Sequence, residues 1–398
     1  MTMTAMIPGT LRADTVSLSS ADFLSDPAAS FIASRTFDRP TLVVSRARVT
    51  AQYDALVAGL GDARIHYAVK ANPAPEIIRL LVQKGARFDA ASRGEIELCL
   101  SQGASGADIS FGNTIKKPAD IAYAHAHGVT LFAADSEAEI DKLRAHAPGA
   151  QVYLRVIVEN SSADWPLSRK FGCARSALAG LMDYAQQHGV DVAGLSFHVG
   201  SQTRRPEFWN PVLDQIAELW IAGRAAGHDL RVLNLGGGFP ATYEEDVMGA
   251  QSYAAAVMDA VAERFGDVPY IMAEPGRGLV AEAGHIVAEV LLVSRKSADD
   301  MHRWVYLDIG MFSGLAETMG EAIRYRIETP HDGGETGACI LAGPSCDSAD
   351  ILYEQRPVML PLALNCGDRV VIRHCGAYTS SYSSVGFNGF PPLDVVVI

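Results

Sequence analysis

The strongest constraint on the fold is a strand–helix unit that recurs between about residues 60 and 280. Short runs of β-branched and aromatic residues alternate there with Ala/Leu/Glu-rich stretches of helical periodicity. Eight runs are predicted to be strands, at residues 64–70, 87–91, 108–111, 129–134, 151–158, 192–199, 231–235 and 270–273. The stretches 75–84, 94–102, 136–147 and 176–188 are predicted to be helices. Eight units are the number in a (β/α)8 barrel, and a doubly wound open sheet is the alternative.

The pattern changes after residue 280. The apolar runs at 286–293, 304–309, 357–362 and 369–372 have no long helices between them, and Gly and Pro interrupt the region. This pattern of apolar runs predicts a second, all-β domain, either a sandwich or a small barrel. Residues 41–45 (TLVVS) are a candidate strand of the same domain. The predicted division is an N-terminal segment, 1–40, that partly joins the β domain, a barrel, 41–280, and a β domain, 281–398.

The composition excludes several classes of protein. With 33 Lys+Arg against 46 Asp+Glu the formal net charge is −13, which argues against a nucleic-acid binder because such a protein needs a basic surface. No uncharged apolar run reaches about 18 residues, so no membrane-spanning helix is expected. The N-terminus lacks the basic and apolar regions of a signal peptide. The six cysteines contain no CxxC pair, so we expect reduced thiols in a cytoplasmic protein, without disulfides or a metal site.

Polar and glycine residues occur at the C-terminal ends of the predicted strands, where a barrel of this kind has its active site. They are Lys70 in YAVKAN, Asp89 in RFDAAS, Arg155, His198 and Ser201 in SFHVGSQ, the glycines 236–238 in LGGGFP, and Glu274 and Arg277 in AEPGRG. Each has an ordinary interpretation when taken alone: a surface lysine, a core histidine, a glycine turn or a capping acid. Their joint position at strand ends favours a functional site.

The residue types at these strand ends suit pyridoxal phosphate. Burial at the end of an apolar strand would lower the pKa of Lys70 and favour an amine that forms a Schiff base. Backbone amides freed by three glycines can bind a phosphate, and Arg277 can add a charge-assisted hydrogen bond. A buried carboxylate, Glu274, would keep the pyridine nitrogen protonated. The GGG run lacks the spacing of a dinucleotide fingerprint, so the hypothesis depends on the whole set.

Seven motifs together resemble the ornithine/lysine/diaminopimelate decarboxylases of the alanine-racemase-like fold. In chain order they are YAVKAN, FDAASRGEIE, SFHVGSQ, LNLGGGFP, AEPGRGLV, GPSCDSAD and GAYTSSYSSVGFNGF, and they extend from about residue 40 to the C-terminus. The resemblance implies a pyridoxal-phosphate-dependent (β/α)8 barrel followed by a β domain. It also implies a head-to-tail homodimer with two shared active sites.

The resemblance assigns roles to individual residues. Lys70 corresponds to the Schiff-base lysine, Glu274 to the partner of the pyridine nitrogen and His198 to the residue stacked on the ring. The positions that contact the phosphate correspond to Ser201, Gly237, Gly238, Arg277 and Tyr378, and those that support the ring correspond to Asp89 and Arg155.

Further roles fall on the predicted β domain. Cys346 of GPSCDSAD corresponds to an acid that the other subunit contributes, which protonates the substrate carbon after carbon dioxide leaves; the ordinary interpretation is a small buried thiol. Asp347 corresponds to the acid that binds the distal amine of the substrate. Lys170 and Asp350 correspond to a pair that bridges the dimer.

The sequence constrains the identity of the substrate less than it constrains the family. Asp347 stands where diaminopimelate decarboxylases usually carry glutamate, which favours a substrate with a terminal amine. Glu317 and Glu321 are alternatives for a second acid, and Phe312 occupies the position of a tyrosine in the animal ornithine enzymes. With DWPLSRKFG, this segment resembles the bacterial enzymes that accept both lysine and ornithine. The predicted substrate-binding residues are Asp347, Glu321, Phe312 and Tyr378.

The leading hypothesis is a decarboxylase of the cationic diamino acids L-ornithine and L-lysine, which yields the polyamine precursors putrescine and cadaverine. The alternatives are a meso-diaminopimelate decarboxylase or a related decarboxylase of a larger amine. An amino acid racemase is disfavoured because no second acid/base group is found opposite Lys70. A non-catalytic regulatory homologue should lack Lys70, Glu274 or Cys346, and all three residues are present.

Overall fold

Eight parallel strands close into a barrel because the last strand pairs with the first. The strands are β2 (Arg64–Ala68), β3 (Arg87–Ala90), β4 (Ile109–Phe111), β5 (Leu131–Ala134), β6 (Gln151–Arg155), β7 (Asp191–Ser196), β8 (Val232–Asn234) and β9 (Tyr270–Ala273). Ile65 of β2 lies opposite Ala273 of β9 in the closing pair. The predicted barrel is confirmed, and the open sheet is excluded. This computed structural model describes residues 25–158 and 170–398.

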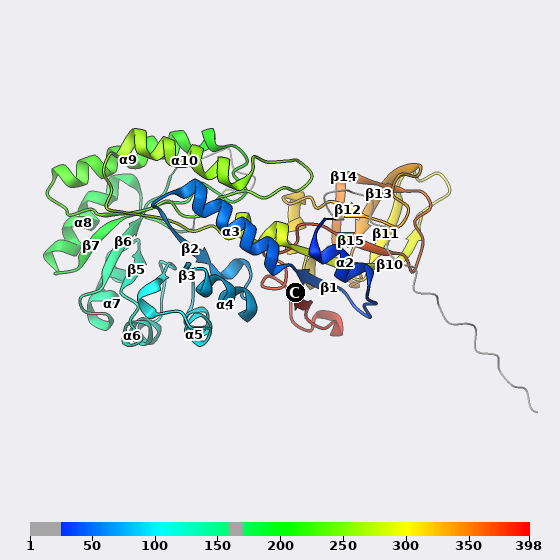
Figure 1. Ribbon diagram of the computed structural model, residues 1–398, viewed down its shortest axis with the longest axis horizontal. Coiled ribbons are helices and arrows are strands. Elements are labelled where there is room, and N and C mark those ends of the chain that lie inside the picture. Colours follow the sequence, from blue (N-terminus) through cyan, green and yellow to red (C-terminus); the bar gives the residue numbers. More distant parts are fainter. Residues whose placement is uncertain (1–24, 159–169) are drawn as a thin grey trace, which may run out of the picture.

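Helices surround the barrel and make up one lobe of the molecule (Figure 1). They are α3 (Arg46–Leu60), α4 (Pro75–Gln83), α5 (Arg93–Ser101), α6 (Pro118–Ala126), α7 (Glu137–His146), α8 (Leu178–Gln187), α9 (Asn210–Ala225) and α10 (Ala250–Phe265). Local sequence sets several of their starts. Ser92 caps α5 by accepting a hydrogen bond from the backbone N–H of Glu95, and prolines occupy the first turns of α4 and α6. The four predicted helices are found within two residues of the expected bounds.

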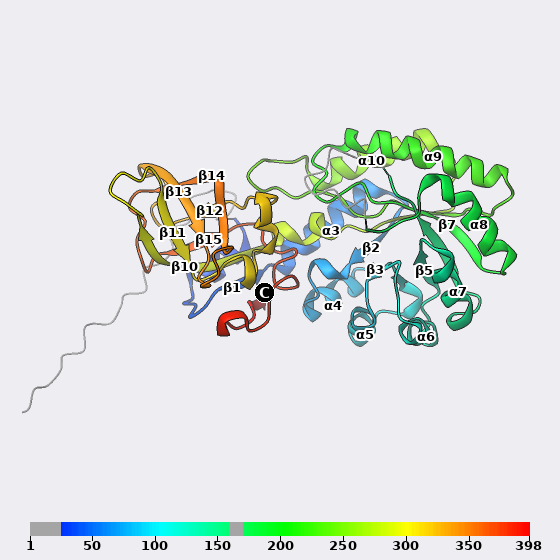
Figure 2. The same cartoon turned by 180° about the vertical axis from the view of Figure 1, so that it is seen from behind.

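The second lobe is a β-rich domain formed by one hydrogen-bonded network of eight strands (Figures 1 and 2). Its main path runs in the order β12 (Ile327–Glu328), β15 (Arg369–Ile372), β10 (Gly284–Ser294), β11 (Arg303–Leu307), β13 (Thr336–Ala342) and β14 (Ile351–Pro361). All these pairs are antiparallel except β11–β13. The pattern in the sequence did not predict β13, and it located only the second half of β14.

Strand β1 (Thr41–Val44) belongs to this second lobe although it precedes the barrel in the chain. It pairs antiparallel with β10 and parallel with the C-terminal strand β16 (Asp394–Val397), which confirms the expectation for residues 41–45. The pairing places the C-terminus between the lobes, beside β1 (Figure 1). Helix α2 (Pro27–Ala33) packs its buried face on the same sheet. Residues 1–24 of the predicted N-terminal segment lie outside the described residues.

The two lobes share one apolar core. The largest cluster of buried side chains extends from barrel residues such as Tyr67 to β-lobe residues such as Ile372. The backbones also meet closely, since a Cβ atom on Gly376 of the β lobe would lie 1.9 Å from the carbonyl oxygen of Val280 at the end of the barrel. The β lobe is therefore fixed against the barrel, and its loops can contribute to a site at the strand ends.

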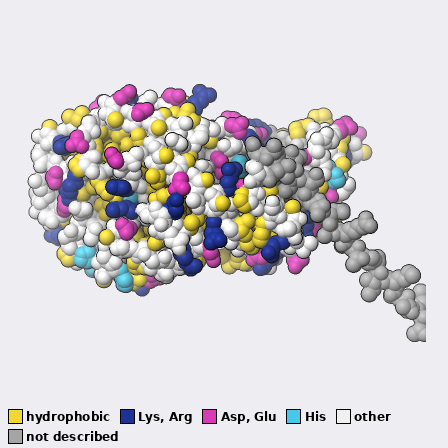
Figure 3. Space-filling view, viewed as in Figure 1, with side chains coloured by type: hydrophobic (Ala, Val, Ile, Leu, Met, Phe, Trp, Pro, Cys, Tyr) yellow, Lys and Arg dark blue, Asp and Glu magenta, His cyan; other side chains and the backbone are white. Residues whose placement is uncertain are grey.

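The surface carries charges of both signs. Acidic and basic side chains are both spread over the face in Figure 3. Among residues 25–158 and 170–398, no helix combines the length and the apolar character needed to cross a membrane.

Candidate active site

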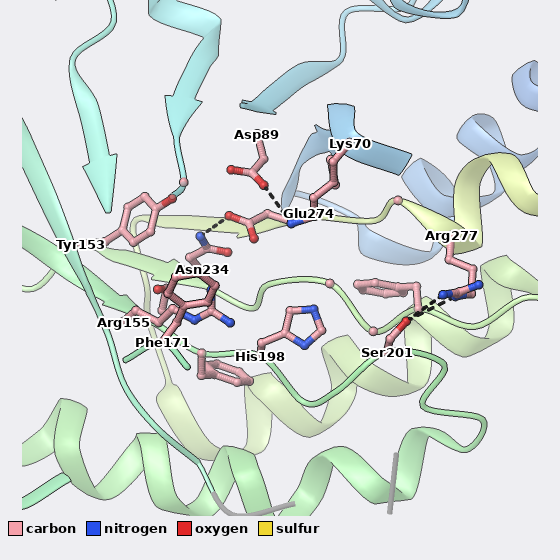
Figure 4. Close-up of a pocket in the computed structure, with 18 of the residues that line it drawn as sticks. Lys70, Asp89, Tyr153, Arg155, Phe171, His198, Ser201, Asn234, Glu274 and Arg277 are labelled. Atoms are coloured by element: carbon pink, nitrogen blue, oxygen red, sulfur yellow. Dashed lines mark hydrogen bonds and ion pairs between the residues drawn. The ribbon is translucent and has the colours of Figure 1, made fainter. Parts of the chain in front are cut away.

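A cavity of about 410 Å³ opens at the C-terminal ends of the barrel strands (Figure 4). All the residues that the sequence assigned to cofactor binding line it. They are Lys70, Asp89, Arg155, His198, Ser201, Gly237, Gly238, Glu274, Arg277 and Tyr378. All of them except Tyr378 lie at the C-terminal end of a barrel strand or within five residues after it, so closure of the barrel brings together side chains far apart in the sequence. Tyr378 comes from the segment after β15.

Lys70 lies just beyond β2, in the short 3-10 turn η1 (Val69–Ala71), and its ammonium group enters the cavity. Its Nζ atom is 4.0 Å from Oδ2 of Asp89, whose side chain is buried at the end of β3. Burial alone would lower the pKa of Lys70, but the nearby Asp89, Tyr378 and Glu274 raise it above its usual value. The expectation of a lowered pKa is therefore wrong for this state, because the sequence does not show the surrounding acids.

Glu274 follows β9 and faces Lys70 and Asp89 across the cavity (Figure 4). Burial and the neighbouring Asp89 raise the pKa of its carboxyl group, while a hydrogen bond from Asn234 opposes the shift. Asn234 Nδ2 donates to Glu274 Oε1 at 2.5 Å, and Asn234 Oδ1 accepts the N–H of Gly236 at 2.8 Å. The side-chain amide of Asn234 therefore holds the carboxylate of Glu274 in place and also binds the first residue of the glycine turn.

His198 lines the cavity between Glu274 and the glycine turn. The N–H of Gly200 donates to Nδ1 of His198 at 2.9 Å, so this nitrogen is an acceptor and the ring is neutral. Burial, with the positive charges of Arg155 and Lys70, lowers the pKa of His198 to about 3. A Cβ atom at position 237 would lie 3.1 Å from Nε2 of His198, so glycine leaves room beside the ring.

The opposite end of the cavity suits an anion. Nε and Nη2 of Arg277 donate to Oγ of Ser201 at 3.3 and 3.1 Å (Figure 4). Gly238 has φ of +104°, and a Cβ atom there would lie 2.5 Å from the side chain of Val199. At Gly276, a Cβ atom would be 3.0 Å from the Tyr378 hydroxyl. A guanidinium, two hydroxyls and exposed backbone therefore converge at this end.

Of the predicted catalytic and substrate-binding residues, four lie outside the cavity: Cys346, Asp347, Phe312 and Glu321. Cys346 and Asp347 are exposed on the β lobe, and the backbone N–H of Cys346 donates to Asn388 Oδ1 at 3.2 Å. Phe312 packs on Phe387, with ring centroids 4.8 Å apart. One chain alone thus does not bring these groups to Lys70.

The structure gives Glu321 a different environment from the one expected of a residue that binds the substrate amine. Its carboxylate accepts backbone N–H groups of β14, from Glu354 at 2.8 Å and Gln355 at 2.6 Å, and pairs with Arg324 at 2.7 Å. The alternative acid, Glu317, pairs with Arg277. The carboxylates of Glu317 and Glu321 are therefore both bound by other groups of the protein. The spacing of acids along the chain could not predict these contacts.

The predicted dimer-bridging pair is also separated within this chain. Lys170 lines the cavity, with Nζ 4.8 Å from the ring centroid of Phe171. Asp350 is buried in the β lobe, where Oδ1 accepts the N–H of Met311 at 2.7 Å. Residues 164–169 of the DWPLSRKFG motif lie outside the described residues.

Several residues that line the cavity were not predicted from the sequence, chiefly Tyr153, Asn234, Phe171 and Gly276. Asn234 had a detectable signal, because it is a polar residue at the end of β8 directly before the glycine run. Gly276 stands inside the quoted AEPGRG motif. Tyr153 had no such signal, since an aromatic residue within a predicted strand is ordinarily part of the core.

Comparison with known proteins identifies the family. Residues 46–281 match the model of the pyridoxal-dependent decarboxylases, pyridoxal binding domain. The chain is 33% identical over 355 residues to a lysine/ornithine decarboxylase of Selenomonas ruminantium, which covers 88% of this chain and 87% of that one. A crystal structure of a lysine/ornithine decarboxylase from Vibrio vulnificus, complexed with cadaverine, superposes with TM-score 0.81 at 32% identity over 91% of this chain and 95% of that one. The arginine decarboxylase of Paramecium bursaria Chlorella virus superposes with TM-score 0.84 at 27% identity over 93% and 99%.

The cavity fits pyridoxal phosphate. That cofactor carries an aldehyde, a pyridine nitrogen and a phosphate, and the cavity offers an amine, a buried carboxylate and an anion-binding end. Oδ1 of Asp89 is buried and has no hydrogen-bond partner within residues 25–158 and 170–398, so it is available to a polar ligand. Glycine at positions 237 and 276 leaves space in the cavity, because a Cβ atom there would contact His198 or Tyr378.

We expect His198 to make the cofactor-free protein less stable in acid. An unfolded histidine has a pKa near 6.5, so between about pH 6.5 and about pH 3 the unfolded chain binds one more proton than the folded chain. Stability should therefore fall as the pH falls through this window, by up to about 2 kcal/mol between about pH 7.5 and about pH 5. In His198→Gln this part of the pH dependence of the unfolding free energy, measured by urea denaturation, should disappear.

His146, exposed at the end of α7, provides the matched control, and His146→Gln should retain the full pH dependence. An unchanged pH dependence in His198→Gln would show that the His198 ring takes up a proton within the folded protein.

Proposed function

Because the chain belongs to the pyridoxal-dependent decarboxylases, we propose that its substrates are L-ornithine and L-lysine. Loss of the α-carboxyl group as carbon dioxide would give putrescine and cadaverine. The observation that carries the proposal is that one cavity holds Lys70, Glu274 and Arg277 together. The kinship with lysine/ornithine decarboxylases of two bacteria supports these two diamino acids as the first candidates.

Bound pyridoxal phosphate supplies an electron sink for the charge left on the α-carbon when carbon dioxide departs. Lys70 would provide the amine that joins the cofactor aldehyde. Glu274, held by Asn234, would accept a hydrogen bond from the protonated pyridine nitrogen and so keep the proton there. Ser201, oriented by Arg277, would hold the phosphate, and the neutral ring of His198 would pack on the cofactor face. His198 would add no charge beside the developing carbanion.

The remaining groups would come from a second copy of the chain, in a homodimer with shared sites. Cys346 and Asp347 are exposed on the β lobe, outside the cavity of their own chain. In the dimer, the partner's Cys346 would donate a proton to the α-carbon, and the partner's Asp347 would bind the distal ammonium group. This arrangement explains how an exposed thiol and an exposed acid can take part in chemistry at a buried cofactor.

A substrate panel tests the assignment. The rate of carbon dioxide release should give measurable kcat/KM for both ornithine and lysine, within about 10–200-fold of each other, because one methylene changes binding by only about 1–3 kcal/mol. Arginine and meso-diaminopimelate should be poorer substrates. Lys70→Ala should release carbon dioxide from none of them. Exclusive turnover of diaminopimelate, or of arginine, would contradict the proposal and favour the decarboxylase of a larger amine.

Subunit mixing tests the shared site. Lys70→Ala and Cys346→Ala subunits should each be nearly inactive as homodimers. Random exchange makes half the dimers hybrids, each with one intact site, so activity should recover to about a quarter of wild type. The matched control mixes Lys70→Ala with Glu274→Ala, because both residues line the cavity of one chain and no hybrid site is intact. Absence of recovery after demonstrated subunit exchange would refute the shared site.

A further inference from the structure

A buried ion pair joins the two lobes directly behind the anion-binding end of the cavity. Arg277 begins α11 (Arg277–Val280), at the end of the barrel, and Glu317 lies in the 3-10 segment η7 (Ala316–Glu321) of the β lobe. Nη1 of Arg277 is 2.7 Å from Oε2 of Glu317, and Nη2 is 2.6 Å from Oε1. The two side chains are only 4% and 9% exposed, so this bidentate pair is shielded from water.

The hydrogen bonds of Arg277 determine its orientation. A guanidinium group has five N–H donors. Glu317 accepts one hydrogen bond from Nη1 and one from Nη2. The hydroxyl of Tyr243 accepts the other hydrogen bond of Nη1, at 2.8 Å. The Nε–Nη2 edge is left for Ser201 Oγ, at 3.3 and 3.1 Å. Ser201 lines the cavity and Glu317 does not, so Glu317 holds the edge of Arg277 that is turned away from the ligand.

We propose that Glu317 is a positioning residue for the phosphate of the cofactor. By filling the Nη1–Nη2 edge, it fixes the Nε–Nη2 edge of Arg277 towards the cavity. Because Ser201 Oγ accepts from that edge, the serine's own hydrogen is free to point at a phosphate oxygen. Glu317 thus acts on the phosphate through Arg277 and Ser201, and the β lobe takes part in binding the cofactor. The inference is independent of which amino acid is the substrate.

Two other roles for Glu317 make different predictions. If the acid only neutralised Arg277, its removal would leave a stronger positive charge, and phosphate would bind more tightly. If the pair only stabilised the fold, its loss would weaken every ligand of the cavity alike. If Glu317 positions Arg277, its removal should lower the affinity only for ligands that carry the phosphate.

The experiment compares pyridoxal phosphate with pyridoxal, which lacks the phosphate, as ligands of the full-length protein freed of cofactor. In Glu317→Gln the Kd of pyridoxal phosphate, measured by absorbance titration, should rise about tenfold or more, by analogy with residues that orient metal ligands, whose loss costs about 10–100-fold in affinity. The Kd of pyridoxal should stay within about twofold of wild type. Glu317→Asp, which keeps the charge but shortens the reach, should give an intermediate loss and serves if Glu317→Gln does not fold.

The matched control is Glu328→Gln, because Glu328 pairs with the buried Arg373 at 2.9 Å in the β lobe and neither residue lines the cavity. This variant should lower the melting temperature and leave the ratio of the two Kd values unchanged. Equal weakening of both ligands in Glu317→Gln would reduce Glu317 to a structural role. Unchanged or tighter binding of pyridoxal phosphate would refute the proposal.

Discussion

The site depends on one constraint: several charged groups share one cavity at the ends of the barrel strands. Lys70, Asp89, Arg155 and Glu274 all line it, and each changes the pKa of at least one other. Burial disfavours the charges of Lys70, Asp89 and Glu274, and the opposite charges nearby offset this cost. A ligand with a cationic ring nitrogen and an anionic phosphate complements this arrangement, because its charges meet protein groups of the opposite sign.

The β lobe completes the site, although most of the site residues lie on the barrel. Tyr378 follows β15 and adopts φ of +54°, and its N–H donates to the carbonyl of Ala71 at 2.8 Å. Ser381 Oγ donates to the carbonyl of Lys70 itself at 2.7 Å. The turn that carries Lys70 is therefore held by the C-terminal segment, while Glu317 holds Arg277 at the other end of the cavity. The two ends of one ligand would thus be positioned by one domain.

Much of this arrangement could be predicted from the sequence, because a parallel barrel has a simple relation between strand ends and site. Eight strand–helix units predicted the fold, and residues that follow the strands, such as Lys70 and His198, lie where the rule puts them. The predictions that were wrong concern properties that depend on contacts between segments distant in the sequence. The raised pKa of Lys70 reflects acids on other strands, and the commitment of Glu321 to β14 follows from tertiary packing. Tyr153 resembled an ordinary core residue, and β13 lacked a distinctive pattern.

The central claim is that Lys70 is the residue that binds the cofactor covalently. Borohydride reduction of the protein loaded with pyridoxal phosphate converts the labile carbon–nitrogen double bond into a stable secondary amine. Digestion and mass spectrometry then locate the pyridoxyl phosphate group. The account predicts this group on Lys70 of the YAVKAN segment, with no labelling of Lys70→Ala. Labelling of another lysine, such as Lys170 beside the same cavity, or undiminished labelling of Lys70→Ala, would contradict it.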